Sequence, residues 1–359
     1  MLFIPHKHLY ISGTSYVSAD EPDYKEVITD ANSRRRMGRL LKMAVWCGLK
    51  SLDGVPSERV AGIITSTGAG FMKDTISFGS SIFDREETLL NPSPFMQSTF
   101  NTASGYIALI RKIHAYNTTY VQQADGFAAS LVDAAMLLDD AGEGNVTLVG
   151  AFDEVTPEVD VIRQRLGLYR VGDGFLPLGE GAAAFLLSAT MPTDGSGSCR
   201  ATEMSAGLGG GDGSESDSGR GGDANSECST GHLHESESAS WPCDEFGSES
   251  SSEPLHDSGG TSSRSLNGTK DGNADLRFCG LANLSDLPKC AGNPIAELFG
   301  INACVNVISC ADHVESLGAF RSLLPVLLCK LISEQQIPDG YTAIMDDVNE
   351  DGVIILLHK

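Results

Sequence analysis

The residues best placed to do chemistry lie in a short polar turn, Gln122-Gln123-Ala124-Asp125-Gly126. An apolar strand ending near Val121 precedes the turn, and an apolar helix predicted over 127–138 follows it. The side chain at the centre of the turn is the amide of Gln123. An amide has no thiolate-like lone pair, so it cannot attack an acyl thioester. The segment therefore has the layout of a nucleophile turn without a nucleophile.

Three further motifs flank this turn in a fixed order along the chain. Glycine loops are common, so each motif is weak evidence by itself, whereas four in order are strong. The four are Ser66-Thr67-Gly68-Ala69-Gly70, the helix with Asn101, Gly105, Ile107 and Ala108, the turn at 122–126, and Asp173-Gly174-Phe175 with Gly179-Glu180-Gly181-Ala182. Together they resemble the β-ketoacyl synthases. That resemblance implies the thiolase fold, in which two similar α/β halves stack in five layers (αβαβα).

The same resemblance implies that the catalytic groups of the family are missing. The acyl-accepting cysteine of these synthases corresponds to Gln123, and their first catalytic histidine corresponds to Ser285. The second histidine has His313 nearby, one position out of register with Gly318. No catalytic residue is assigned with these three positions changed, because condensation needs a thiolate and imidazoles that stabilise an enolate.

Two of these positions have other interpretations. In synthase domains with a cysteine-to-glutamine change, the amide is thought to mimic an acyl group and promote malonyl decarboxylation, but Ser285 is a poor substitute for the imidazole that this reaction needs. In the alternative interpretation of Gln123, its amide fills the turn and forms local hydrogen bonds. In the alternative interpretation of His313, it is a surface histidine near the start of a helix.

Composition limits the partners of the chain. A net charge of -23 over 359 residues argues against nucleic acid, which needs clustered Lys and Arg. Nine cysteines without paired spacing, no signal peptide and no apolar run of about 18 residues predict a reduced, cytoplasmic protein without a membrane span. No cofactor is predicted, because Ser66–Gly70 lacks the Lys-Ser/Thr of a phosphate-binding loop. The scattered Cys228, His232, His234 and Cys243 do not have the paired spacing of a metal site.

The chain divides into two globular parts and one that is not globular. Residues 1–197 match the N-terminal half of the synthases, and residues 198–210 with 275–359 form an abbreviated C-terminal half. Between them, residues 211–274 hold 13 acidic and 3 basic side chains, 16 serines and 11 glycines. We expect this segment to be a disordered insertion, because it cannot bury enough apolar surface to offset chain entropy.

In the globular parts, alternating helices and strands predict an α/β domain with much parallel sheet. The expected helices open at 33 and cover 101–116, 127–138 and 317–334. The expected strands lie at 60–65, 146–149, 183–187, 201–206, 276–281, 305–309 and 352–357.

The resemblance is greatest to chain-length-factor-type synthases, in particular those of aryl polyene and flexirubin pigment clusters. It implies a non-catalytic subunit that forms a heterodimer with a Cys-bearing β-ketoacyl synthase through the sheet edge at 117–123, and that meets an acyl carrier protein only indirectly. The alternatives are a divergent synthase or malonyl decarboxylase with relocated residues, and a scaffold protein without an acyl role.

Overall fold

A computed structural model describes residues 7–122, 125–190, 202–206, 278–281, 294–299, 301–348 and 352–359. Gln123, Ser285 and the expected insertion at 211–274, with its cysteines and histidines, lie outside these ranges.

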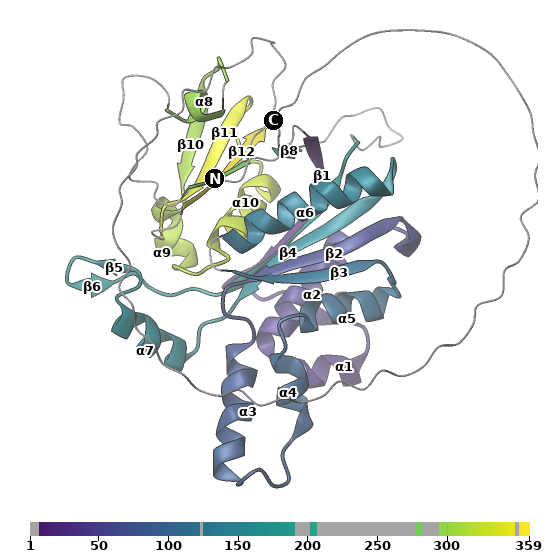
Figure 1. The fold of residues 1–359 in the computed structure, drawn as a ribbon, viewed down its shortest axis with the longest axis vertical. Helices are drawn as coiled ribbons and strands as arrows, with labels where there is room; N and C mark the ends of the chain where they lie inside the picture. Colours follow the sequence, from purple (N-terminus) through teal and green to yellow (C-terminus); the bar gives the residue numbers. More distant parts are fainter. Residues whose placement is uncertain are drawn as a thin grey trace, which may run out of the picture. The chain divides into compact units, whose positions relative to one another are not determined.

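Ten strands of the described residues join in one sheet in the order β10-β11-β12-β8-β1-β7-β4-β2-β3, with β9 also pairing with β12 (Figure 1). The N-terminal part of the sheet is β3-β2-β4-β7-β1, in which β2, β3 and β4 are parallel and β7 runs antiparallel to β4 and β1. The N-terminal strands are β1 (Lys7–Val17), β2 (Val60–Thr67), β3 (Tyr116–Val121), β4 (Val146–Asp153) and β7 (Gly181–Ser188). The others are β8 (Thr202–Ala206), β9 (Phe278–Leu281), β10 (Val305–Ser309), β11 (Tyr341–Asp346) and β12 (Gly352–His358).

The strands are apolar at consecutive positions, and successive residues of a strand point to opposite sides, so apolar side chains lie on both faces of the sheet. In β7, Ala182, Ala184 and Leu186 pack with α2 (Arg39–Ser51) and α5 (Thr102–Arg111). Their neighbours Ala183, Phe185 and Leu187 pack on the other face, with α6 (Asp125–Ala141) and α10 (Leu323–Ser333).

The helices α6 and α10 form the central layer. Both contribute to the same buried cluster as Val353, Ile355 and Leu357 of β12. The intervening residues Ile354 and Leu356 face the opposite side, where they pack with Ile295 and Phe299 of α8 (Pro294–Phe299). The sheet has two parts, linked by β1, which pairs with β8 over Lys7–Ile11 and with β7 over Tyr10–Val17. The two parts enclose α6 and α10 and carry helices on their outer faces, so the layers run helix, sheet, helix, sheet, helix and the predicted thiolase-like fold is confirmed.

Several predicted boundaries were wrong for local reasons. The helix expected from 33 is two helices, α1 (Ala31–Arg36) and α2, because Met37 and Gly38 are extended and the Gln97 side chain binds the Gly38 N–H and the Arg36 carbonyl. The helix expected to reach residue 116 ends at Arg111, where Lys112 takes a left-handed conformation. The helix expected over 317–334 begins only at Leu323 as α10, because Gly318 ends the preceding short helix α9 (Val314–Leu317). Strand β11 was not predicted.

Two helical segments lie beside the sheet (Figure 1). Helices α3 (Met72–Asp84) and α4 (Pro92–Ser98) pack against each other, with Phe78 and Phe95 in ring contact at 5.1 Å. Helix α7 (Pro157–Leu166) is followed by the small hairpin β5 (Arg170–Val171) and β6 (Gly174–Phe175). No helix in the described part of the chain has both the length and the apolar character needed to cross a membrane.

The two strands that flank the expected insertion pair with adjacent stretches of β12. In β8, Glu203 faces His358 and Met204 faces Leu357. In β9, the pairing runs from Phe278 opposite Ile355 to Leu281 opposite Gly352.

We predict that a short Gly-Ser linker can replace residues 211–274 with a fall in melting temperature of less than about 3 °C, on the order of 1 kcal/mol. The flanking strands need only a short connection, and loop length changes closure entropy slowly. Thermal unfolding followed by circular dichroism measures the effect, with a scrambled 211–274 sequence as the control. A large fall with the linker but not with the scrambled segment would contradict the prediction.

Candidate functional site

The carboxyl ends of β2 and β4 meet at one edge of the sheet, where the Ser66–Gly70 loop folds around one carboxylate. Asp153 Oδ1 accepts hydrogen bonds from Thr67 Oγ1 (3.0 Å), the Gly68 N–H (2.9 Å) and the Ala69 N–H (3.0 Å). Thr67 Oγ1 in turn accepts from the Gly70 N–H at 2.8 Å. The glycine loop is thus organised by an internal carboxylate, which supports its interpretation as a packing element.

Asp153 is 4% exposed, and its surroundings have opposing effects on the pKa of its carboxyl. Burial raises its pKa to about 6, although the hydrogen bonds from Ala69, Thr67 and Gly68 and the charge of Arg321 favour the ionised form. Its neighbour Glu154 is also buried, and burial raises the pKa of that carboxyl while the Lys73 N–H donates to it at 2.8 Å. Two acids at the end of β4 are therefore held with their own hydrogen-bond donors.

Gly179, from the motif at 179–182, and Gly318, from the segment after His313, are in backbone contact at this edge. A Cβ on Gly179 would lie 1.9 Å from the Leu317 carbonyl oxygen, and one on Gly318, at φ +75°, would lie 2.4 Å from the Gly179 nitrogen. Backbone hydrogen bonds join the same segments, from the Ala319 N–H to the Pro177 carbonyl (2.7 Å) and from the Gly179 N–H to the Ala319 carbonyl (3.3 Å). Only glycine fits at either position.

Arg321 follows directly and lies over the glycine loop. A Cβ built on Gly68 would lie 1.8 Å from Arg321 Cδ, so the methylene groups of Arg321 occupy the space in front of the loop. The cavity left between these elements has a volume of 40 Å³, room for about three water molecules. We call it the arginine cavity, and its lining includes Asp153, Glu154, Arg163, Tyr169, Phe320 and Arg321.

Of the three predicted site positions, the structure describes only His313. It ends a single turn of 3-10 helix, Ala311–His313, and precedes α9. Its backbone N–H donates to the Cys310 carbonyl (3.0 Å), and its carbonyl accepts from Ser316 Oγ (3.0 Å). His313 is half-buried and does not line the arginine cavity. The roles of Gln123 and Ser285 stay predictions.

The sequence analysis did not single out Asp153, Arg163, Tyr169 and Arg321 as site residues. The signal for Asp153 was present, since Asp153-Glu154 directly follows the apolar run 146–152. Arg321 and Tyr169 carried no such signal. Tyr169 adopts φ +58°, which non-glycine residues rarely do.

The buried cysteines do not offer a substitute nucleophile. Burial raises the pKa of the Cys47, Cys310 and Cys329 thiols, which keeps them protonated at neutral pH. Cys47 Sγ and Cys329 Sγ lie 3.5 and 3.6 Å from the carbonyl oxygens of Ala182 and Ala184 in β7. Among the described cysteines only Cys304 is exposed.

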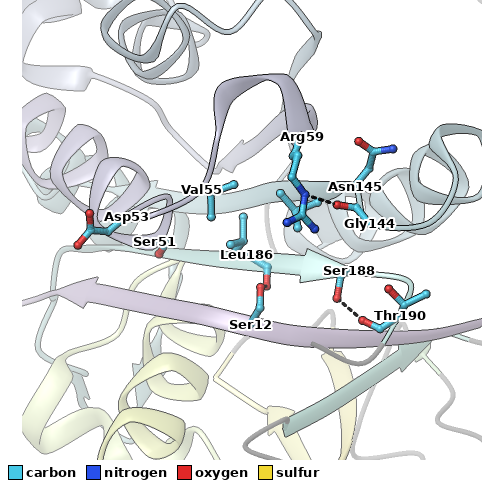
Figure 2. A pocket seen from close by; sticks show the side chains of 11 residues that line it. Ser12, Ser51, Asp53, Val55, Arg59, Gly144, Asn145, Leu186, Ser188 and Thr190 are labelled. Atoms are coloured by element: carbon cyan, nitrogen blue, oxygen red, sulfur yellow. Dashed lines mark hydrogen bonds between the residues drawn. The ribbon is translucent and has the colours of Figure 1, made fainter. Parts of the chain in front are cut away.

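A larger cavity of 360 Å³ lies at the opposite end of the strands, where β2 and β4 begin (Figure 2). Arg59 Nε donates to the Gly144 carbonyl across its upper rim (2.6 Å), and Ser188 Oγ donates to the Thr190 carbonyl at one end (2.7 Å). Its lining shares no residue with the arginine cavity. Cavity size alone therefore does not locate the edge at which the sequence motifs meet.

Comparison with known proteins agrees with the motif order. Residues 14–165 match the family model described as the N-terminal domain of β-ketoacyl synthases. A search of curated proteins by sequence finds no match.

Two solved structures superpose on nearly the whole chain. The ishigamide ketosynthase/chain length factor does so with a TM-score of 0.59 and 13% identity, over 97% of this chain and 98% of that one. AntDE:AntF, a type II polyketide synthase acyl-carrier protein in complex with its ketosynthase bound to the hexaketide, gives 0.57 and 13% identity, over 98% and 99%. A ketosynthase in complex with its chain length factor from Xenorhabdus doucetiae gives 0.38 and 16% identity, over 50% and 78%.

Residues 14–165 therefore match the N-terminal domain of the β-ketoacyl synthases, and the described chain has the thiolase-like fold that this resemblance implied. The described residues at the carboxyl edge form a small site lined by apolar side chains, two carboxyls and two arginines.

We predict that Asp153→Asn changes how stability depends on pH. The folded-state pKa of about 6 lies above that of an unfolded aspartate, so the folded protein binds the extra proton and wild-type stability falls as pH rises through 6. Asparagine does not ionise. The free energy of unfolding of the variant relative to wild type should therefore improve by roughly 1 kcal/mol between pH 5 and pH 7.5. Urea unfolding of both proteins at the two pH values measures this difference, and equal pH slopes would contradict it.

We also predict that the full chain takes up no stoichiometric label from an acyl thioester or a cerulenin-like electrophile. Gln123 offers no nucleophile, and burial keeps Cys47, Cys310 and Cys329 protonated. Intact-mass analysis measures labelling, and Cys304→Ser controls for the exposed thiol. Label mapped to any other single cysteine would show that the nucleophile has been relocated.

Proposed function

We propose that this chain is a non-catalytic, chain-length-factor-like subunit that forms a heterodimer with a Cys-bearing β-ketoacyl synthase. The observation that carries the proposal is the packing at the edge where the synthase motifs meet, where Arg321 Cδ lies over Gly68 and occupies the space in front of the glycine loop. Gln123 and Ser285, at the positions of the nucleophile and the first histidine, support the same conclusion. The chemistry then belongs to the partner.

The proposed contact surface begins at β3, the last strand of the sheet order. Among the described strands β3 pairs only with β2, so its outer edge is open. Tyr116 and Val121, at the two ends of β3, are 44% and 43% exposed. Their strand is tied to the body by Asp133 of α6, which accepts from the Tyr116 and Tyr120 hydroxyls at 3.0 and 3.1 Å. A rigid open edge of this kind favours pairing with another strand.

Exposed apolar side chains continue from β3 over the helices that adjoin it. Helix α5 contacts β3, α4 contacts α5, and α3 packs on α4. Helix α3 has no buried residue, although it contains Ile76, Phe78, Ile82 and Phe83. The most exposed large apolar residues on these helices and the segment between α3 and α4 are Phe83 (85%), Leu89 (91%), Met96 (65%) and Leu109 (74%). Exposed apolar surface over contiguous elements is typical of protein interfaces.

The occupant we propose is a homologous synthase subunit whose own β3-equivalent strand would continue the sheet. The two full-length structural neighbours support this choice, because one is a ketosynthase/chain length factor and the other a ketosynthase with its acyl-carrier protein. An acyl carrier protein would then meet this chain through the partner. We further propose a fatty-acid or polyketide-type product of the aryl polyene class, on the resemblance of the Arg34-Arg35-Arg36-Met37 segment and of the abbreviated C-terminal half.

We predict that Val121→Glu abolishes the complex with the partner synthase, because it places a carboxylate without a counter-charge in a strand-to-strand contact. Co-expression with candidate Cys-bearing subunits, followed by native mass measurement, tests the complex, and turnover of malonyl and acyl carrier substrates tests its activity. Both should be lost in this variant.

Val307→Glu is the matched control. Val307 is a 51% exposed valine on β10, at the other end of the sheet order, so the change adds the same charge to a strand away from β3. The complex and its activity should survive it. A partner that is fully active alone, or with the Val121→Glu protein, would refute the subunit role and favour a divergent enzyme or a scaffold.

A further inference from the structure

One face of helix α6 is acidic and borders the open edge of β3. Ala129, Asp133, Met136 and Asp140 follow one another at intervals of four, three and four residues, so they lie on one face of the helix. Met136 is 61% exposed and Asp140 is exposed, while Ala129 and Asp133 are half-buried. We call this face the acidic stripe.

Asp133 holds the acidic stripe beside the middle of β3. Tyr116 and Tyr120 lie four residues apart on one face of the strand, and both hydroxyls donate to the same atom, Asp133 Oδ2. Burial, and then the hydrogen bond and charge of Asp133, raise the pKa of both hydroxyls, that of Tyr120 to about 12. The tyrosines therefore stay protonated donors at neutral pH. Asp133 Oδ1 makes no hydrogen bond with the described residues, so it is available to a donor from another chain.

The charge of the stripe is not neutralised by ion pairs within the described part of the chain. None of the ion pairs there involves Asp133 or Asp140. Helix α6 contains four aspartates and neither lysine nor arginine, and the sequence has no lysine or arginine between Lys112 and Arg163. Lys112 and His114 are exposed, but they precede the start of β3, whereas Asp133 lies at its middle.

Pairing of two copies of this chain through β3 would bring their acidic stripes together. A two-fold interface places the same surface of both copies in contact, and antiparallel pairing centred on a strand sets its middle opposite itself. Asp133 of one copy would then lie close to Asp133 of the other. Like charges that face each other destabilise such a contact.

We propose that the acidic stripe selects the partner of this chain. It excludes a second copy and binds a synthase subunit that carries lysine or arginine on the helix equivalent to α6. A basic side chain of that subunit donates to Asp133 Oδ1 while the two tyrosines keep Oδ2, because a carboxylate accepts at both oxygens. The identity of the occupant rests on the proposed function, whereas the exclusion of a second copy depends on this chain alone.

Asp133→Asn tests the selection of the partner, because asparagine still accepts from the tyrosine hydroxyls but carries no charge. Titration calorimetry with the partner synthase should show binding weakened about tenfold at low salt, and by much less at high salt, which screens the charge of the wild type. Glu143→Gln is the matched control, an exposed acid beyond the end of α6, and should bind as wild type. Unchanged affinity of Asp133→Asn, in a complex that Val121→Glu still abolishes, would overturn the stripe and leave the subunit role standing.

Sedimentation of the full chain by itself tests the exclusion of a second copy. Wild type should be a monomer at concentrations where the double variant Asp133→Asn with Asp140→Asn forms a dimer, and adding Val121→Glu to the double variant should restore the monomer. Circular dichroism checks folding, and the exposed Asp140→Asn alone replaces the double variant if that protein does not fold. A wild-type dimer that Val121→Glu dissociates would overturn the proposal, and so would a folded double variant that stays monomeric.

Discussion

The close approach of Gly179 and Gly318 is the constraint on which the rest of the structure depends. Two backbone segments from the two halves of the chain touch with no side chain between them, and two backbone hydrogen bonds hold the contact. A side chain at either position would push the segments apart. Because Gly318 also ends α9 in a left-handed conformation, it sets the point at which the chain turns toward α10 in the central layer. The five layers therefore meet at this edge through backbone packing.

This contact also decides what the carboxyl edge can do. Once Gly318 is seated, Arg321 falls over Gly68, and the glycine loop is held from the other side by Asp153. A buried carboxylate is costly when ionised, and its pKa of about 6 shows that three hydrogen bonds and a nearby guanidinium only partly offset burial. The loop is thus held by the Asp153 carboxylate, whose burial is itself unfavourable when it is ionised. The same packing leaves a cavity of 40 Å³ between the glycine loop and Arg321.

The apolar surface of this protein is distributed unevenly. The central helix α10 buries nearly all of its residues, whereas α3 buries none, although both are rich in apolar side chains. An isolated helix with apolar residues and no burial gains little from folding. That cost is offset if α3, α4 and the open edge of β3 are covered in an assembly.

The fold class and the order of the motifs were evident in the sequence, because apolar periodicity and glycine spacing are local properties of the chain. The runs 60–65 and 183–187 predicted strands β2 and β7, and the five layers were implied by the family that the four motifs resemble. Helix boundaries depended on distant groups and were missed: Gln97 interrupts the helix expected from 33, and Gly179 interrupts the one expected from 317. The arginine cavity was also beyond the sequence. Arg163, Tyr169 and Arg321 look like ordinary polar residues in the chain, and only the packing of α7 and the Gly318 segment against the end of β4 buries one guanidinium without an acceptor.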